Sequence, residues 1–190
     1  MTRLFTSLSV AAMALAGLTL SAEDFNSMMK VTQATWPEKH HIGVICNYQA
    51  NEAQVRSLAA AAGEKALITV VDARHFDQAN IAAILLVNRK ADYVVLMPND
   101  LKFRDGSFGA TIALHQLAQR GVPAIGTTPA ALRQGAVFTI GDGTNGELLV
   151  TDKVIGTVSV ILPDRSAPLR QANLIFRQEG MATIAVHTMD

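Results

Sequence analysis

Apolar residues in the middle of the chain occur in short runs that alternate with helical stripes. The apolar run at 93–97 is followed by a polar loop, then by apolar residues at helical spacing between Ser107 and Gly121, and then by a second apolar run at 122–125. This order predicts a strand, a helix and a second strand. A right-handed crossover should make the two strands parallel neighbours.

The same alternation extends over residues 41–140. Strands are predicted at 41–47, 67–71, 93–97, 122–125 and 136–140, and helices between Asn51 and Gly63, at 78–88 and between Ser107 and Gly121, with one more helix at 23–33. Asn51 is predicted to cap its helix, with Gln54 completing a capping box. Strands that alternate with helices of this length predict an α/β fold, with a mostly parallel, doubly wound sheet built on a β-α-β-α-β-α-β core.

The pattern changes after residue 140. Turn residues cluster at 141–146, and the segments beyond them are rich in β-branched residues without a helical stripe. We expect antiparallel strands at 147–150 and 154–162, and two more short strands or a terminal strand pair at 170–176 and 182–187. The predicted fold is therefore a parallel core with extra C-terminal antiparallel strands.

The first 22 residues are set apart from this pattern. Arg3 supplies a positive end, residues 8–18 are apolar, and Leu20-Ser21-Ala22 closes the segment before Glu23. This arrangement is typical of a secretory signal peptide, and the apolar stretch is short for a membrane-spanning helix. We expect an exported, periplasmic protein with a signal peptide at 1–22 and a single α/β domain at 23–190. An uncleaved anchor is the alternative.

Composition and charge limit the function classes. With 190 residues, 49% of them hydrophobic and 17% charged, the chain is long and apolar enough for one compact domain. Its 16 basic residues balance its 16 acidic ones. Arg3 is the only charged residue among residues 1–22, so their removal leaves a net charge of about −1. This balance gives no electrostatic case for nucleic-acid binding.

Motifs of catalysis and of metal binding are missing from the sequence. It contains no phosphate-binding loop, dinucleotide fingerprint or nucleophile elbow. The five histidines show no metal-ligand spacing; they are His40, His41, His75, His115 and His187. Cys46, the single cysteine, lies in an apolar run and is interpreted as a buried side chain, with a reactive thiol as the alternative. We therefore expect a non-enzymatic protein without a cofactor or metal. An exported hydrolase with residues assembled across the sequence is the alternative.

Polar residues follow two of the predicted parallel strands. Asn99 and Asp100 come after the strand at 93–97, and Thr127 and Thr128 come after the strand at 122–125. Ligands of open parallel sheets bind at the carboxyl ends of the strands. Asn99 and Asp100 have two interpretations, a turn that bonds its own backbone or a polar clamp for a small ligand. Because both are predicted loop residues, we expect their replacement to change binding more than stability.

Three segments of the chain carry a family resemblance. They are HIGVICNYQANEAQVRSLAAAAG from His41, ADYVVLMPND from Ala91, and GVPAIGTTPAALRQGAVFTIG from Gly121. In this order and spacing they resemble one lobe of the periplasmic substrate-binding proteins of ABC transporters, which have a type 1 periplasmic-binding-protein-like fold. The resemblance spans about 42–141, and the chain has material for one lobe where that family has two.

The resemblance implies a set of ligand-facing residues. Three loops would contribute two residues each: Gln49 and Asn51, Asn99 and Asp100, and Thr127 and Thr128. The implied function is an exported, non-enzymatic binding protein related to the solute-binding component of ABC transporters. It would hold a small polar solute, or a membrane permease or sensor protein, at the carboxyl ends of the parallel strands, with a homo-oligomer left open.

A single lobe cannot close on a ligand by hinging. The alternative function is therefore a periplasmic regulatory or interaction protein that has kept the lobe and lost solute capture. An aromatic or amide-rich set of loops favours solute binding. An exposed apolar patch at the carboxyl edge of the sheet favours an interaction protein.

Overall fold

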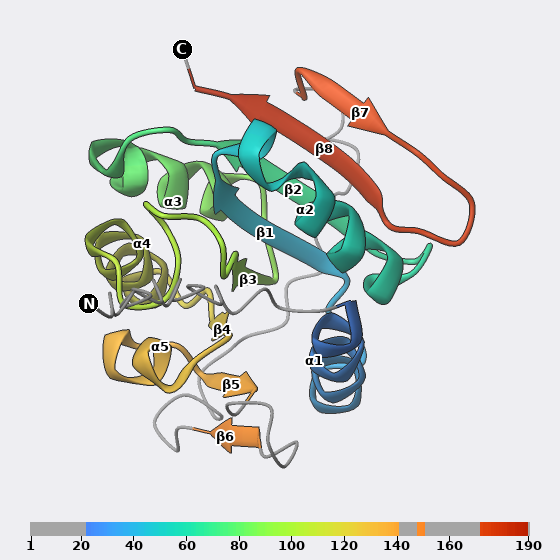
Figure 1. The fold of residues 1–190 in the computed structure, drawn as a ribbon, viewed down its shortest axis with the longest axis horizontal. Coiled ribbons are helices and arrows are strands. Elements are labelled where there is room, and N and C mark those ends of the chain that lie inside the picture. Colours follow the sequence, from blue (N-terminus) through green and yellow to red (C-terminus); the bar gives the residue numbers. More distant parts are fainter. Residues whose placement is uncertain (1–21, 141–147, 151–171, 190) are drawn as a thin grey trace, which may run out of the picture.

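The computed structural model describes residues 22–140, 148–150 and 172–189. These form an 8-stranded sheet in the order β6-β5-β4-β3-β1-β2-β8-β7 (Figure 1). The strands are β1 (His41–Cys46), β2 (Leu67–Asp72), β3 (Tyr93–Leu96), β4 (Ala124–Gly126), β5 (Phe138–Ile140), β6 (Leu148–Val150), β7 (Leu174–Phe176) and β8 (Thr183–Thr188). The helices are α1 (Ala22–Thr35), α2 (Tyr48–Ala62), α3 (Ala79–Asn88), α4 (Phe108–Gln119) and α5 (Pro129–Gln134), with a short 3₁₀ helix η1 (Phe76–Gln78).

The interior of the sheet is parallel and its two edges are antiparallel. Strands β5, β4, β3, β1, β2 and β8 run parallel, whereas β6 pairs antiparallel with β5 and β7 antiparallel with β8. The predicted fold class is confirmed: an α/β fold with a mostly parallel, doubly wound sheet and C-terminal antiparallel strands. Within it, the order β2-β1-β3-β4-β5 is the flavodoxin-like order, whose ligand crevice lies where the crossovers diverge, between β1 and β3.

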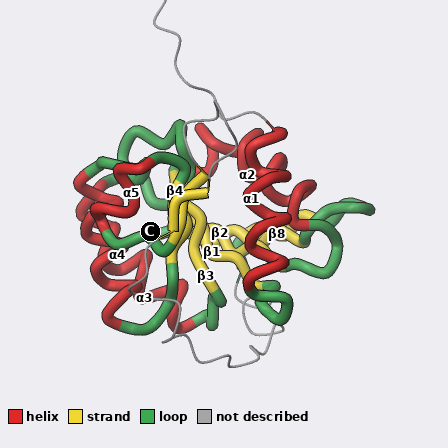
Figure 2. The backbone as a smooth tube through the Cα atoms, turned by 90° about the horizontal axis from the view of Figure 1, so that it is seen from below, coloured by secondary structure: helices red, strands yellow, loops and turns green. Residues whose placement is uncertain are grey.

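Helices cover both faces of the sheet (Figure 2). Helices α1 and α2 pack on one face, and α3, α4 and α5 pack on the other. Neighbouring residues of β3 point to opposite faces: Val95 belongs to the core under α1 and α2, and Val94 to the core under α3 and α4. Burial on both sides explains why the strands are continuous apolar runs rather than alternating ones. None of the helices in the described ranges is long and apolar enough to cross a membrane.

The start of α2 differs from the prediction. Helix α2 begins at Tyr48, and its N-cap is Asn47, whose side chain accepts a hydrogen bond from the Ala50 amide at 3.3 Å. The predicted cap at Asn51 is wrong, because Asn51 already lies in the first turn, where its backbone amide donates to the Asn47 carbonyl. Both asparagines suit a cap, and the shape of the β1–α2 connection selects the earlier one.

The C-terminal predictions are confirmed where they can be followed. The strand predicted at 147–150 is β6, and the segments at 170–176 and 182–187 form the terminal pair β7 and β8. In addition, β8 extends the parallel sheet beside β2, which the sequence did not predict. The predicted strand at 154–162 lies outside the described residues, as do the turn at 141–146 and residues 1–21.

Candidate binding surface at the strand carboxyl ends

Asp100, just beyond β3, ties two loops together. Its side chain is buried, with 2% of the residue exposed. Oδ1 accepts the backbone amides of Lys102 and Phe103 at 2.8 and 2.9 Å. Oδ2 accepts the Asn47 amide at 2.7 Å and the Asn51 side-chain amide at 2.9 Å. Four donors fill the acceptor sites of one carboxylate, so Asp100 holds the β3–α4 loop against the start of α2.

This geometry corrects one expectation for Asp100. A loop residue whose loss changes stability little should be solvated, whereas Asp100 is buried and fully hydrogen-bonded within the protein. Asn51, also buried, donates its side-chain amide to the Asn47 carbonyl as well as to Asp100. The structure therefore brings Asn51 and Asp100 together, and it uses them to position loops.

A second carboxylate lies at the start of α2. Asp72, the last residue of β2, is buried, and its Oδ1 accepts the Tyr48 amide at 2.9 Å. Its Oδ2 accepts a hydrogen bond from the Arg74 guanidinium at 3.2 Å. Helix N-termini attract anions, and in doubly wound proteins this is a common place for a phosphate or carboxylate ligand. Here Asp72 and Asp100 supply that negative charge from within the protein.

Asp105 forms a separate network with the loop after β4. Its Oδ2 accepts the backbone amides of Thr127 and Thr128 at 2.7 and 2.5 Å and the Thr127 hydroxyl at 3.2 Å. Gly126 is needed for this approach, since a Cβ there would lie 2.1 Å from the Ala131 Cβ and 3.1 Å from Oδ2. Asp105 thus holds the loop before α4 against Thr127 and Thr128 in the loop after β4. Thr128 also caps α5, because its hydroxyl accepts the Ala130 amide.

Three of the six candidate residues are exposed to solvent: Gln49, Asn99 and Thr128. Gln49 follows β1 and Asn99 follows β3, and these strands are neighbours in the sheet. Their connecting helices pack on opposite faces, so the two amides flank the point where the crossovers diverge. The other candidates, Asn51, Asp100 and Thr127, are buried and hydrogen-bonded to protein groups.

An exposed aromatic pair lies at the same edge of the sheet. Phe76 starts η1 after β2, and Phe108 starts α4; 50% and 66% of these residues are exposed. Their rings meet edge to face, with centroids 5.6 Å apart and an interplanar angle of 67°. Leu101, in the β3–α4 loop, is 75% exposed. We call Phe76, Leu101 and Phe108 the aromatic surface. The sequence prediction missed it, because the sequence does not show that these two phenylalanines are exposed.

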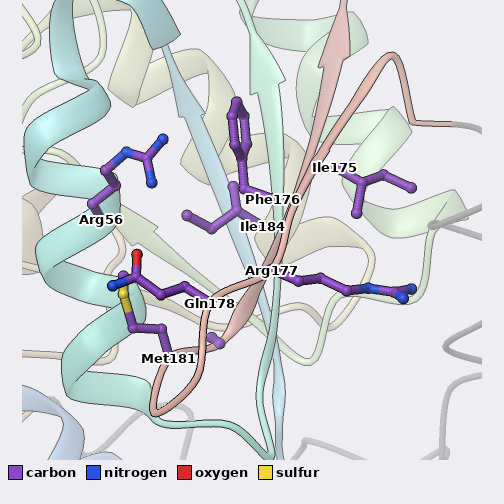
Figure 3. Close-up of a pocket in the computed structure, with 8 residues that line it drawn as sticks. Arg56, Ile175, Phe176, Arg177, Gln178, Met181 and Ile184 are labelled. Atoms are coloured by element: carbon purple, nitrogen blue, oxygen red, sulfur yellow. The ribbon is translucent and has the colours of Figure 1, made fainter.

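A groove of about 230 Å³ lies away from this edge, between α2 and the β7–β8 pair (Figure 3). The Arg56 guanidinium lies 4.9 Å from the centroid of the Phe176 ring and bonds the Glu52 carboxylate at 2.8 Å. Figure 3 shows Arg177 directed away from Arg56. Of the two arginines that line the groove, Arg56 is thus paired with Glu52 within α2 and packs on the Phe176 ring.

Cys46 is fully buried, as predicted. Burial, followed by the nearby carboxylates of Asp100 and Asp72, raises the pKa of its thiol well above the ordinary value. Because the thiolate is the nucleophilic form, burial and the raised pKa of the thiol both favour the interpretation of Cys46 as a buried structural side chain over a reactive thiol. In the described part of the chain, no three His, Cys, Asp or Glu side chains are grouped so that they could hold a metal ion.

Burial raises the pKa of the Asp105 carboxyl, and the hydrogen bonds from Thr127 and Thr128 offset only part of this effect. The folded protein then binds this proton more tightly than the unfolded chain does. The resulting stability is present below the unfolded pKa of 3.8 and is lost as the pH rises through the folded pKa. We expect Asp105→Asn, which cannot ionise, to gain stability relative to wild type as the pH rises from about 4 to about 7.

Urea unfolding of both proteins across this pH range measures the difference, with Asp77→Asn, a change at an exposed carboxylate, as the control. A difference that moves in favour of wild type as the pH rises would contradict the expectation. It would mean that the hydrogen bonds to the ionised carboxylate outweigh the cost of burying it.

Comparison with known proteins adds no family assignment. No protein-family model matches the chain. A search of curated proteins finds no match either.

Proposed function

We propose that the chain is an exported, non-enzymatic interaction protein that acts in the periplasm and binds a partner protein at the carboxyl edge of its sheet. In this proposal it has kept a lobe resembling those of the solute-binding proteins of ABC transporters and has lost solute capture. The observation that carries the proposal is the exposed Phe76–Phe108 pair.

Large exposed apolar side chains that lie together mark contact surfaces. An aromatic side chain buries roughly 150–250 Å² when it is fully covered, and with Phe76 50% and Phe108 66% exposed about half to two thirds of that area is available to a partner on each ring. Aromatic residues are also enriched at protein interfaces relative to the remaining surface. In this protein the pair lies at the edge of the sheet where doubly wound proteins bind their ligands.

The polar groups at this edge support the same proposal. Asp72, Asp100 and Asp105 already accept hydrogen bonds from backbone amides of neighbouring loops. A solute would have to displace these bonds in order to reach the carboxylates, and each broken bond would leave a polar group that needs a new partner.

A second candidate function is the binding of a small polar solute. It is favoured by the exposed amides of Gln49 and Asn99, which flank the divergence point between β1 and β3. The aromatic side chains of Phe76 and Phe108 at the same edge are compatible with it as well. Two amides in an open site could supply hydrogen bonds that are partly solvated. We expect affinity in the micromolar range or weaker for such a site.

Site-specific photo-crosslinking tests the interaction proposal. A photoreactive phenylalanine derivative would replace Phe76 or Phe108, and position 118, which is exposed on α4 beyond the aromatic surface, would serve as the matched control. In cells that express the protein from its own gene, we expect one discrete protein adduct from positions 76 and 108 and none from position 118. Absence of adducts at 76 and 108, or the same adducts at 118, would contradict the proposal.

A thermal-shift screen tests the second candidate. Amino acids, sugars and small organic acids at millimolar concentration would be compared on wild type and on the Gln49→Ala/Asn99→Ala variant. The interaction proposal expects no stabilisation by any of them. A compound that raises the melting temperature of wild type, but not of the variant, would replace the proposal with solute binding.

A further inference from the structure

We infer that the partner segment bound by the aromatic surface is acidic, with an apolar side chain as its anchor. This inference rests on the proposed function and specifies the chemistry of the partner. It follows from the rigidity of the aromatic surface, from the charges around it, and from the inward orientation of the acidic groups at this edge.

The loop that carries Leu101 is fixed against the start of α4. The Ser107 hydroxyl donates to the Lys102 carbonyl at 2.8 Å, and an added Cβ at Gly109 would lie 2.4 Å from the same carbonyl oxygen. Phe103, in the same loop, is fully buried in the core under α3 and α4. The aromatic surface is therefore a preformed one, which lowers the entropy cost of binding.

Exposed positive charges outnumber exposed negative charges near the aromatic surface. Exposed cations lie close in sequence to each of its residues; they are Arg74, Lys102 and Arg104. Arg74 is paired with Asp72, whereas Lys102 and Arg104 form no ion pair with any residue that the structure describes. The acidic residues of the same loops are turned inward, except for Asp77, which is exposed.

The excess of exposed positive charge at this edge arises because the nearby carboxylates are turned into the protein. The Asp72, Asp100 and Asp105 side chains accept hydrogen bonds from backbone amides. At the solvent side of this edge the exposed Lys102 and Arg104, which lie beside Leu101 and shortly before Phe108 in the chain, outnumber the one exposed carboxylate, Asp77; we call these two cations the basic rim. Potentials across an interface tend to be complementary, so the matching partner carries acidic residues around an apolar anchor.

Two other occupants fit less well. A second copy of this chain would place one basic rim against another, which is unfavourable in a two-fold contact. An anionic membrane attracts polybasic surfaces at about 1 kcal/mol for each basic residue. Such surfaces carry clusters of roughly four to eight basic residues, whereas this edge exposes two cations that form no ion pair with a described residue, so a protein segment with an apolar anchor is the better match.

Peptide binding to the full mature chain tests the inference. The probe is a fluorescein-labelled peptide with a Leu-Trp-Leu centre and three glutamates on each side, and its partner probe has lysines in place of the glutamates. Fluorescence anisotropy would be measured at low and moderate salt. We expect the glutamate peptide to bind at least about tenfold more tightly than the lysine peptide, and this preference to shrink with added salt.

Three double variants locate the site, and melting curves verify that each is folded. Phe76→Ser/Phe108→Ser and Lys102→Glu/Arg104→Glu should each weaken binding of the glutamate peptide at least about fivefold. Leu174→Ser/Arg177→Glu, which changes an exposed apolar residue and a cation on and beside β7, is the matched control. It should change binding by less than about twofold.

Several results would overturn the inference. Equal binding of the two peptides, binding of neither, or an equal loss in the β7 control would each reject it. Binding to phosphatidylglycerol vesicles in place of the peptide would indicate a membrane surface. A dimer in sedimentation that Phe108→Ser abolishes would indicate a second copy. The proposed function can survive a failure of this inference. If positions 76 and 108 give crosslinks but the peptides bind equally, bind not at all, or lose binding equally in the β7 control, the acidic chemistry of the partner is rejected and the proposed function stands.

Discussion

Replacing Asp100 with Ala is expected to lower the free energy of unfolding by about 3–5 kcal/mol. The substitution removes an acceptor from four donors: the amides of Asn47, Lys102 and Phe103, and the side-chain amide of Asn51. Because Asp100 and Asn51 are buried, water cannot readily replace the lost bonds. The connection between the β3–α4 loop and the start of α2 would be lost with them.

Urea unfolding measures this loss, and the neighbouring residue provides the control. Asn99 is exposed, so Asn99→Ala should change the free energy of unfolding by less than about 0.5 kcal/mol. Asp100→Asn keeps one acceptor oxygen, so its loss of unfolding free energy should lie between those of Asp100→Ala and Asn99→Ala. A loss below about 1 kcal/mol for Asp100→Ala would mean that this carboxylate does not hold the two loops together.

The parallel core could be predicted because its physical signal is local. A strand that is covered on both faces must be apolar throughout, and a helix on the sheet must repeat its apolar residues every three or four positions. The place of β8 beside β2 could not be predicted in this way. Its sequence specifies a strand, but its pairing with β2 depends on the path of the chain between β6 and β8, which has no local sequence signal.

The candidate residues lie at the carboxyl edge of the sheet, as their places after the predicted strands implied, but several of them have a role within the protein that the sequence did not predict. Asn51, Asp100 and Thr127 lie there, but in hydrogen-bond networks within the protein. Asp72 and Asp105 were missed because their main partners are backbone amides, which have no sequence signature.

The aromatic surface was missed for a related reason. Phe76 and Phe108 come from the ends of different strands, and only the folded sheet brings their rings within 5.6 Å. Exposure also depends on tertiary structure: Phe103, in the loop between β3 and α4, is fully buried, whereas Phe108, the first residue of α4, is mostly exposed. Composition and spacing cannot separate the two cases, since both are apolar residues in a polar context.

Val95→Ala is the second substitution with a large expected effect. Val95 lies in β3 with none of its surface exposed, between Val44 of β1 and Ile125 of β4. It belongs to the core under α1 and α2, and the surrounding sheet can collapse little around a smaller side chain. Loss of two methyl groups together with the remaining cavity should cost roughly 2–4 kcal/mol.

Urea melts of Val95→Ala would measure this cost, and Val122→Ala is the matched control because Val122 is only partly buried, before β4. The control should lose less than about 1 kcal/mol. Equal slopes of the two transitions would show that the denatured states are comparable. A loss below about 0.5 kcal/mol for Val95→Ala would contradict the position of β3 at the centre of the sheet, where both faces are covered and a cavity cannot fill.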